Sequence, residues 1–194
     1  MHIGVDYGSK LAGTTSICFR SEGYLLFKTS GKKQDADVMI SGFLEEHPTV
    51  SQVFIDAPLS LPKIYLNPNS NSEEFFYREA DRAIRAMSPM FLGGLTARAM
   101  KLASTFSKVG IVFYESYPSG LVDEIKLDRS LYKKEKEYIG SITNAILDSF
   151  QLKVKHIPSS WHEVDALLAY IIGKRFNEGE VKRVGDASEG IIYY

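Results

Sequence analysis

Three apolar segments, far apart in the chain, each run into a carboxylate. The segments and their acids are Asp6 after residues 2–5, Asp56 within residues 50–57, and Glu115 after residues 109–114. An unpaired charge at the end of a buried strand is costly, yet strand ends are where ligand sites form in open α/β sheets. The pattern therefore predicts an α/β fold whose strands carry these acids toward one site.

The spacing of the apolar segments predicts the order and direction of the strands. The second and third strands, at residues 11–20 and 24–29, follow the first after short turns and are expected to be antiparallel. A helix from Asp35 to about Glu46 then leads into the strand at 50–57, and such a crossover makes that strand parallel to the first. We expect a mixed five-stranded central sheet, with strands 1–3 antiparallel, strands 4 and 5 parallel to strand 1, and helices on both faces.

The remaining elements fit one domain over residues 1–194, with a helical insertion at about 63–108. Within the insertion we predict a loop at residues 67–72 and helices at 73–87 and 95–107. The elements expected after the fifth strand are helices at 133–150 and 161–176, a short strand at 152–157, and a turn with a final strand at 185–194.

The first insertion helix carries charged side chains at spacings of three and four, which places them on one helical face. They are Arg78, Asp81, Arg82 and Arg85. A solvated face with internal ion pairs is the common use of such a run. The functional interpretation is a wall of arginines able to meet phosphates. On that interpretation Arg78, Arg82 and Arg85, together with Lys10, are the candidate substrate-binding residues.

Composition limits the setting in which such a site would work. The formal net charge is −1, so nucleic-acid binding would have to come from a local basic patch. The single cysteine, Cys18, excludes an intrachain disulfide and fits a reducing compartment. No apolar run reaches the roughly 18 residues of a membrane span, and no signal peptide is visible. We expect a cytoplasmic protein without membrane contact.

The helix predicted from Trp161 contributes two more polar candidates. His162 and Asp165 are three residues apart and share a face, and Ser160 is a suitable N-cap. His162 could orient a water, move a proton or touch a phosphate. Its alternative is a helix-start residue with no chemical role.

Four acids now stand at strand ends or a helix start: Asp6, Asp56, Glu115 and Asp165. Clustered carboxylates repel one another and attract a cation. Ligands that are all oxygen favour Mg²⁺ or Mn²⁺ over zinc. Two such ions about 4 Å apart can activate a water and stabilise the leaving oxygen in phosphodiester hydrolysis. We therefore predict a metal centre built from these four acids, with His162 assisting.

The order of these features resembles the RNase H-like fold, and the helix start resembles the His-x-x-Asp-Ala motif of RuvC-type resolvases. More closely, the chain is similar to a predicted-nuclease family of RNase H-like fold known as domain of unknown function 429. The resemblance implies that fold, an acidic site and a divalent metal. The blocks that carry it are Ile3-Gly4-Val5-Asp6, Val53-Phe54-Ile55-Asp56-Ala57-Pro58-Leu59, Arg78-x-x-Asp81-Arg82, Tyr114-Glu115-x-Tyr117-Pro118-Ser119, His162-x-x-Asp165-Ala166 and Gly185-Asp186-x-x-Glu189-Gly190-Ile191.

Three functions follow as hypotheses. The first is a metal-dependent nuclease, a hydrolase with catalytic residues Asp6, Asp56, Glu115, His162 and Asp165, acting on DNA or RNA as monomer or homodimer. The second is a nucleic-acid or protein-binding module of the same fold without turnover. The third is an ATP-binding phosphotransferase of the actin and sugar-kinase type, which the Asp6-Tyr7-Gly8 turn also fits. That fold uses two such domains, and 194 residues are too few for both.

Overall fold

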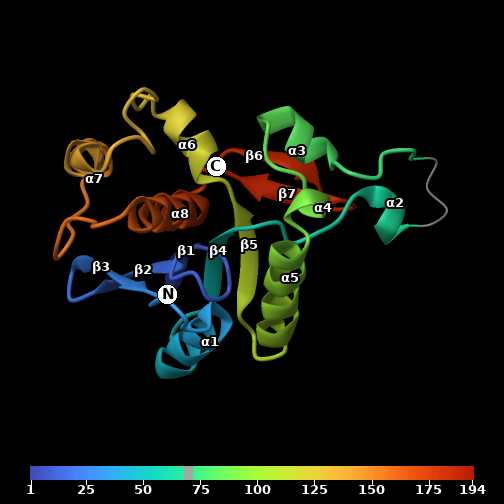
Figure 1. Cartoon of the computed structure of the whole chain (residues 1–194), viewed down its shortest axis with the longest axis horizontal. Helices are drawn as coiled ribbons and strands as arrows, with labels where there is room; N and C mark the ends of the chain where they lie inside the picture. The colour runs from blue at the N-terminus through green and yellow to red at the C-terminus, as the bar shows by residue number, and fades with distance from the viewer. Residues whose placement is uncertain (68–71) are drawn as a thin grey trace.

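The computed structural model describes residues 1–67 and 72–194. Over these residues the chain is an α/β structure with one mixed sheet of seven strands, in the order β3-β2-β1-β4-β5-β7-β6 (Figure 1). The strands are β1 (His2–Asp6), β2 (Ser16–Ser21), β3 (Tyr24–Thr29), β4 (Gln52–Asp56), β5 (Val112–Ser116), β6 (Arg183–Asp186) and β7 (Gly190–Tyr193).

The strand directions explain why several ends meet at one edge of the sheet. β2 is antiparallel to both β1 and β3, while β4 is parallel to β1 and β5 is parallel to β4. These are the directions predicted for five strands, but the sheet has seven. β7 is parallel to β5 and β6 is antiparallel to β7, so the predicted final strand is a hairpin. The predicted strand at 152–157 is wrong, because Val154 forms only a single bridge with Leu25.

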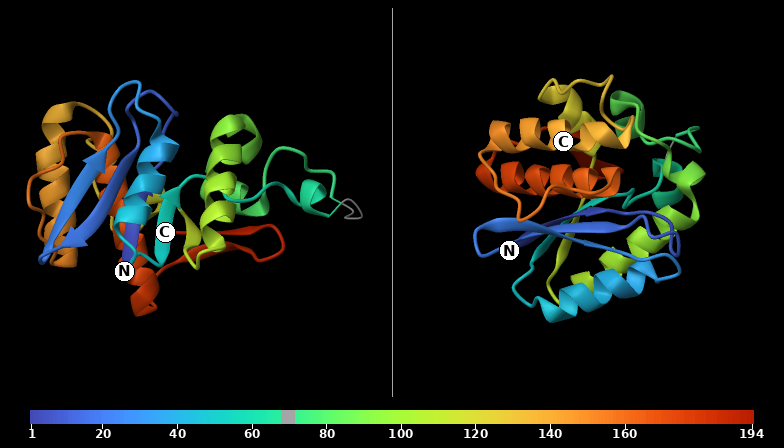
Figure 2. Two further views of the ribbon diagram at one scale, coloured as in Figure 1. Left: turned by 90° about the horizontal axis from the view of Figure 1, so that it is seen from below. Right: turned by 60° about the vertical axis from the view of Figure 1, so that its left-hand side comes forward.

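Helices cover both faces of the sheet. Figure 2 shows α7 and α8 in orange on one side of the blue strands, with α1 in cyan and α5 in green on the other. The helices are α1 (Ala36–Glu46), α2 (Lys63–Leu66), α3 (Glu79–Ile84), α4 (Pro89–Leu92), α5 (Gly94–Ser107), α6 (Pro118–Glu124), the short 3₁₀ helix η1 (Lys136–Tyr138), α7 (Ile139–Phe150) and α8 (Trp161–Glu178).

Each face of the sheet has its own apolar core, because successive side chains of a strand point to opposite faces. Phe54 packs in the core beneath α7 and α8, whereas Val53 and Ile55 pack in the core beneath α1 and α5. Asp56 follows Ile55 and therefore lies on the α8 face. Because side chains alternate along a strand, a shift of one position moves an acid from one face of the sheet to the other.

Gly4 allows α8 to lie unusually close to β1. A Cβ atom built at Gly4 would stand 2.1 Å from the Tyr170 nitrogen and 2.4 Å from the Ala166 oxygen. Real Cβ atoms do not approach backbone this closely, so only glycine fits here. The contact holds the N-terminal part of α8 beside the end of β1, where Asp6 lies.

Two helices are shorter than predicted, and local polar contacts explain both. The helix predicted at 73–87 begins only at Glu79, because the Asp81 carboxylate accepts the Arg78 backbone N–H at 2.8 Å and sets the helix start. The helix predicted at 133–150 begins at Ile139 after η1, because Lys133 has a left-handed backbone with φ of 59°. The predicted loop at 67–72 lies mostly outside the described residues.

Among residues 1–67 and 72–194, no helix combines the length and apolarity that crossing a bilayer requires.

Candidate metal centre

Three of the four predicted acids meet at the carboxyl end of the parallel strands. Asp6 and Asp56 are directly opposite each other in the β1–β4 pairing, and both end their strands. Asp165 comes from the start of α8, which Gly4 holds against β1. One carboxylate oxygen from each of the three acids lies within 4.8 Å of the other two. The cluster predicted from the sequence therefore exists for these three residues.

The three carboxylates differ in their partners. His162 Nδ1 lies 2.7 Å from Asp6 Oδ2, so the predicted helix-start histidine joins the cluster. Asp165 accepts a hydrogen bond from the Tyr132 hydroxyl on one oxygen and pairs with Lys133 Nζ at 2.6 Å on the other. In the part of the chain that the structure describes, no hydrogen-bond donor or cation contacts the Asp56 carboxylate. Within the described residues, Asp56 is thus the member of the cluster without a hydrogen-bond or ion-pair partner.

Burial and mutual repulsion shift the protonation of the centre. Burial, with the neighbouring charges of Asp6 and Asp165, raises the pKa of Asp56 well above its usual value. Burial also raises the pKa of Asp165 to about 6, although Lys133 opposes the shift. The hydrogen bond to Asp6 raises the pKa of His162. These shifts favour the protonated forms of Asp56 and Asp165 more than in free carboxyl groups, and a bound divalent cation would oppose them.

Two contributors were missed from the sequence, Tyr132 and Lys133. They lie between α6 and η1, in a segment where the sequence predicts the start of a helix. The Lys133 side chain is about half exposed and pairs with Asp165. Burial lowers the pKa of Lys133, but the charge and hydrogen bond of Asp165 together with the charges of Asp56 and Asp6 outweigh it, so the pKa is raised. No motif marks these residues, because the left-handed backbone at Lys133 that turns its side chain to the cluster has no pattern in the sequence.

The structure does not bring Glu115, the fourth predicted acid, into the acidic cluster, and strand register is the reason. Glu115 pairs with Ile55, one residue before Asp56, so its side chain leaves the opposite face of the sheet. There it accepts two hydrogen bonds from Arg78, at 2.7 and 2.6 Å, and one from the Leu59 backbone N–H at 2.9 Å. Its negative charge is therefore already satisfied by a protein cation.

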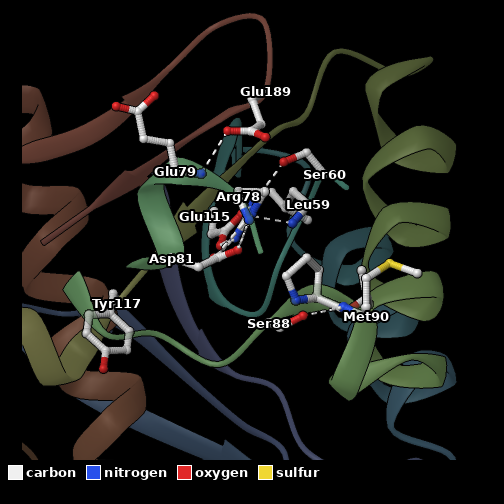
Figure 3. Close-up of polar contacts among 12 residues, drawn as sticks. Leu59, Ser60, Arg78, Glu79, Asp81, Ser88, Met90, Glu115, Tyr117 and Glu189 are labelled. Carbon is white, nitrogen blue, oxygen red and sulfur yellow. Dashed lines mark hydrogen bonds and ion pairs between the residues drawn. The ribbon is translucent and has the colours of Figure 1, made fainter. Parts of the chain in front are cut away.

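Arg78, which was predicted to bind substrate, is instead buried at the centre of this second group. Its side chain is completely buried and contacts Asp81, Glu115 and the Ser60 hydroxyl, as Figure 3 shows. A buried guanidinium held between two carboxylates has no donors left for an external phosphate. We call Arg78, Asp81, Glu115 and Ser60 the arginine network.

Motif residues near the C-terminus support the arginine network. Glu189 accepts the backbone N–H groups of Lys63 and Glu79, at 2.9 and 2.8 Å. A Cβ at Gly190 would stand 2.2 Å from Ser60 Oγ and 3.2 Å from Arg78 Nη1, so the hairpin closes tightly over the buried guanidinium. The blocks that carry the family resemblance thus divide between two places, the acidic cluster and this network.

The other predicted substrate-binding residues are exposed and do not join the acidic cluster. Lys10 pairs with Asp35 at 3.0 Å, and Arg82 pairs with Glu74. Arg85 follows the end of α3, and its carbonyl accepts a weak hydrogen bond of 3.5 Å from the Tyr117 hydroxyl. The predicted single face is absent among these residues, because Arg78 and Arg85 both lie outside the helical part of α3.

A small pocket lies beside the acidic cluster. It has a volume of about 110 Å³, and Asp56, Ala86, Met87, Ser116 and Tyr117 are among the residues that line it. Ala86 and Met87 directly follow Arg85 in the chain. Arg85 is therefore the exposed arginine that directly precedes residues lining the pocket beside Asp56.

Comparison with models of protein families finds no family that matches the chain, and comparison with curated proteins finds no similar sequence. The resemblance to the predicted-nuclease family therefore remains a prediction that rests on the short motifs.

The donor set of the acidic cluster fits a hard divalent cation. Three carboxylates converge, one of them has no partner, and neither cysteine nor a second histidine accompanies them among the described residues. Mg²⁺ and Mn²⁺ prefer such oxygen ligands. Asp6, Asp56 and Asp165 are the residues that would hold the ion, and Glu115 is not.

Proposed function

We propose that this protein is a divalent-metal-dependent nuclease of RNase H-like fold, similar to the predicted-nuclease family named above, that hydrolyses phosphodiester bonds. The observation that carries the proposal is the convergence of Asp6, Asp56 and Asp165, with the Asp56 carboxylate left without a partner among the described residues. Leaving a carboxylate partly buried and unpaired costs stability. A role in holding a cation explains why the chain keeps it there.

The chemistry divides between the ion and the side chains. When bound, Mg²⁺ or Mn²⁺ would supply a Lewis acid and lower the pKa of a water molecule. Asp6 and Asp56 orient their carboxylates from adjacent strands, so their spacing is fixed by the sheet. In the hydrolysis, the oxygen of water bonds to phosphorus and releases one proton to solvent, the bond from phosphorus to the leaving oxygen breaks, and the leaving oxygen takes a proton.

His162 is the proposed source of that proton. Its Nδ1 is engaged by Asp6, and Nε2 has no partner in the described part of the chain. The His162 side chain is 42% exposed, and Nε2 is the atom proposed to meet the substrate. Because Asp6 raises the pKa of His162, the ring retains a proton closer to neutral pH than a free histidine would. A general acid of this kind typically contributes a factor of about 10² to 10⁴ in rate.

The phosphate backbone would be held by exposed cations. Arg85 and Lys10 are the candidates: Arg85 precedes the residues that line the pocket beside Asp56, and Lys10, which pairs with Asp35, follows Asp6 by four residues. Arg82 is paired with Glu74 and would have to exchange that partner for a phosphate. The formal net charge of −1 makes these local cations necessary, since the chain has no global positive field.

The test is cleavage of labelled branched, duplex, hybrid and single-stranded nucleic acids in Mg²⁺ or Mn²⁺. We expect at least one substrate to be cut, activity to vanish with EDTA, and the Asp6→Asn variant to be inactive. Absence of cleavage with every substrate, or cleavage that is unchanged in Asp6→Asn, contradicts the proposal. Nucleic-acid binding without cleavage would favour the binding module, and ATP binding in calorimetry would favour the phosphotransferase.

A further inference from the structure

Lys133 lies at the acidic cluster in a left-handed backbone conformation, which Lys33 and Lys126 of this chain also adopt. Its φ of 59° lies in the left-handed region, which side chains other than glycine, asparagine and aspartate generally avoid. Such positions persist where the surrounding structure fixes them, and they occur often at functional sites. The conformation directs the Lys133 ammonium to Asp165, at 2.6 Å.

Contacts on both sides of Lys133 fix this conformation. Tyr132 is buried, donates its hydroxyl proton to Asp165, and packs edge-on against Trp161 with ring centroids 5.6 Å apart. The Trp161 indole N–H donates to the Lys134 carbonyl at 3.0 Å. The residues before and after Lys133 are therefore both tied to the start of α8, the helix that carries Asp165. The surrounding contacts therefore hold the segment that places the Lys133 ammonium in the cluster.

The distribution of engaged oxygens separates the cluster into two halves. Tyr132 and Lys133 engage both oxygens of Asp165, and His162 engages one oxygen of Asp6. Within the described residues, the oxygens left without a partner are the other oxygen of Asp6 and both oxygens of Asp56. These two acids lie opposite each other on β1 and β4. One half of the cluster is open, and the other already has a cation.

The charges lead to the same division. Three ionised aspartates carry −3, which one divalent ion and one ammonium balance, whereas two divalent ions with the ammonium would exceed it by two charges. A protonated His162 would widen that excess. Unbalanced charges of one sign at close range disfavour binding of the last ion.

We propose that the centre binds a single divalent cation through Asp6 and Asp56, with Asp165 nearby, and that Lys133 supplies the second positive charge at Asp165. This rests on the proposed function insofar as the cluster is a metal centre, but it replaces the two-ion mechanism expected from the sequence. Lys133 is thus a positioning residue that sets the number of ions the centre accepts.

The experiment is a titration of the metal-free full chain with Mn²⁺. Binding is measured by calorimetry and by the EPR signal of free Mn²⁺. We expect one Mn²⁺ per chain for the wild type and for Lys133→Arg, and two for Lys133→Met. The matched control is Lys134→Met, which removes the neighbouring exposed lysine and should leave one ion per chain.

Three outcomes overturn the proposal. They are binding of two ions by the wild type, binding of the same number of ions by Lys133→Met as by the wild type, and binding of no ion by either protein. The wild-type number decides alone if Lys133→Met fails to fold, as judged by circular dichroism. Binding and cleavage are separate readouts. One bound Mn²⁺ without cleavage of any substrate keeps this inference and removes the nuclease, whereas cleavage with two bound ions does the reverse.

Discussion

The chain contains two groups of converging carboxylates, and they solve the same electrostatic problem differently. In the arginine network, Asp81 and Glu115 share the guanidinium of Arg78, and every charge has a partner within 3.2 Å. In the acidic cluster, three aspartates converge with Lys133 at one corner and no partner for Asp56 among the described residues. The first group is closed by the protein itself, whereas the second is open to a cation from outside.

The comparison shows that acidity alone does not distinguish a metal centre from a structural ion pair. Asp56 and Glu115 both lie at the ends of parallel strands, yet one residue of register places them on opposite faces. A buried pair that has lost one partner is strongly destabilising, because the remaining charge stays desolvated. Substitutions in the network should therefore affect mainly stability, and substitutions in the cluster should affect mainly metal binding and activity.

The largest effect is expected in the arginine network. Arg78→Met leaves Asp81 and Glu115 buried without their cation, and should lower the free energy of unfolding by about 3–5 kcal/mol. Urea denaturation followed by circular dichroism measures this. The matched control is Arg82→Met, whose exposed ion pair should be worth about 0–1 kcal/mol. Similar losses for both variants would mean that the buried network contributes no more to the free energy of unfolding than an exposed ion pair does.

The next effect is a pH dependence of stability in the acidic cluster. The pKa of Asp165 is raised from 3.8 to about 6, so the folded chain binds this proton more tightly than the unfolded chain does. The stability from this group is fully present below about pH 4 and is lost as the pH rises through 6. At 1.36 kcal/mol per pKa unit the loss is about 3 kcal/mol.

Urea denaturation of the metal-free protein in EDTA between pH 4 and pH 7 checks this contribution. The Asp165→Asn variant has no proton to lose at this position, so its stability should change less over the same range than that of the wild type. Parallel pH profiles for the two proteins would contradict an elevated pKa at Asp165.

A smaller energetic effect is expected when a metal ligand is removed. Asp6→Asn should weaken Mn²⁺ binding by more than about 10-fold, while the free energy of unfolding without metal stays the same or rises, because a repulsive charge is lost. Calorimetry and denaturation measure the two quantities. Glu115→Gln is the informative partner: it should reduce stability and leave Mn²⁺ affinity unchanged. The reverse pattern would place Glu115 in the metal centre after all.

The smallest effect concerns Arg85. If it contacts one phosphate, Arg85→Gln should weaken binding of a single-stranded oligonucleotide a few-fold and lower the slope of log affinity against log salt by about 0.7. Fluorescence anisotropy at several KCl concentrations, in Ca²⁺ in place of Mg²⁺, provides the measurement. An unchanged slope removes Arg85 from the interface. Lys10→Gln, measured in the same way, tests the other exposed candidate.

Much of the fold could be predicted because it depends on local pattern. The apolar runs before Asp6 and Asp56, and the Asp35 cap of α1, correctly give strands, a crossover helix and parallel pairing. The β6–β7 hairpin was only half predicted. Its two strands are four residues each, with Gly185 and Gly190 at positive φ, and so short a pair has little periodicity to detect.

The site was predicted in part for a related reason. Asp6, Asp56 and Asp165 follow from strand ends and a helix start, which a sequence displays. The face on which Glu115 lies could not be predicted, because strand register is decided by pairing between strands that are distant in the chain. Lys133 was not predicted, because its position depends on its own left-handed backbone conformation and on the contacts of Tyr132 with Asp165 and Trp161. Sequence motifs thus locate the clustered acids but not the lysine that pairs with one of them.

The backbone contact at Gly4 has a consequence for how the centre keeps its dimensions. Because no side chain separates β1 from α8 there, the gap between Asp6 and Asp165 is set by two main chains touching, which cannot repack as side chains do. Strand and helix therefore move as one piece, and heating or crowding should change the spacing of the ligands little. The absence of a Cβ atom at residue 4 thus fixes the distance between two of the acids that we propose hold the metal.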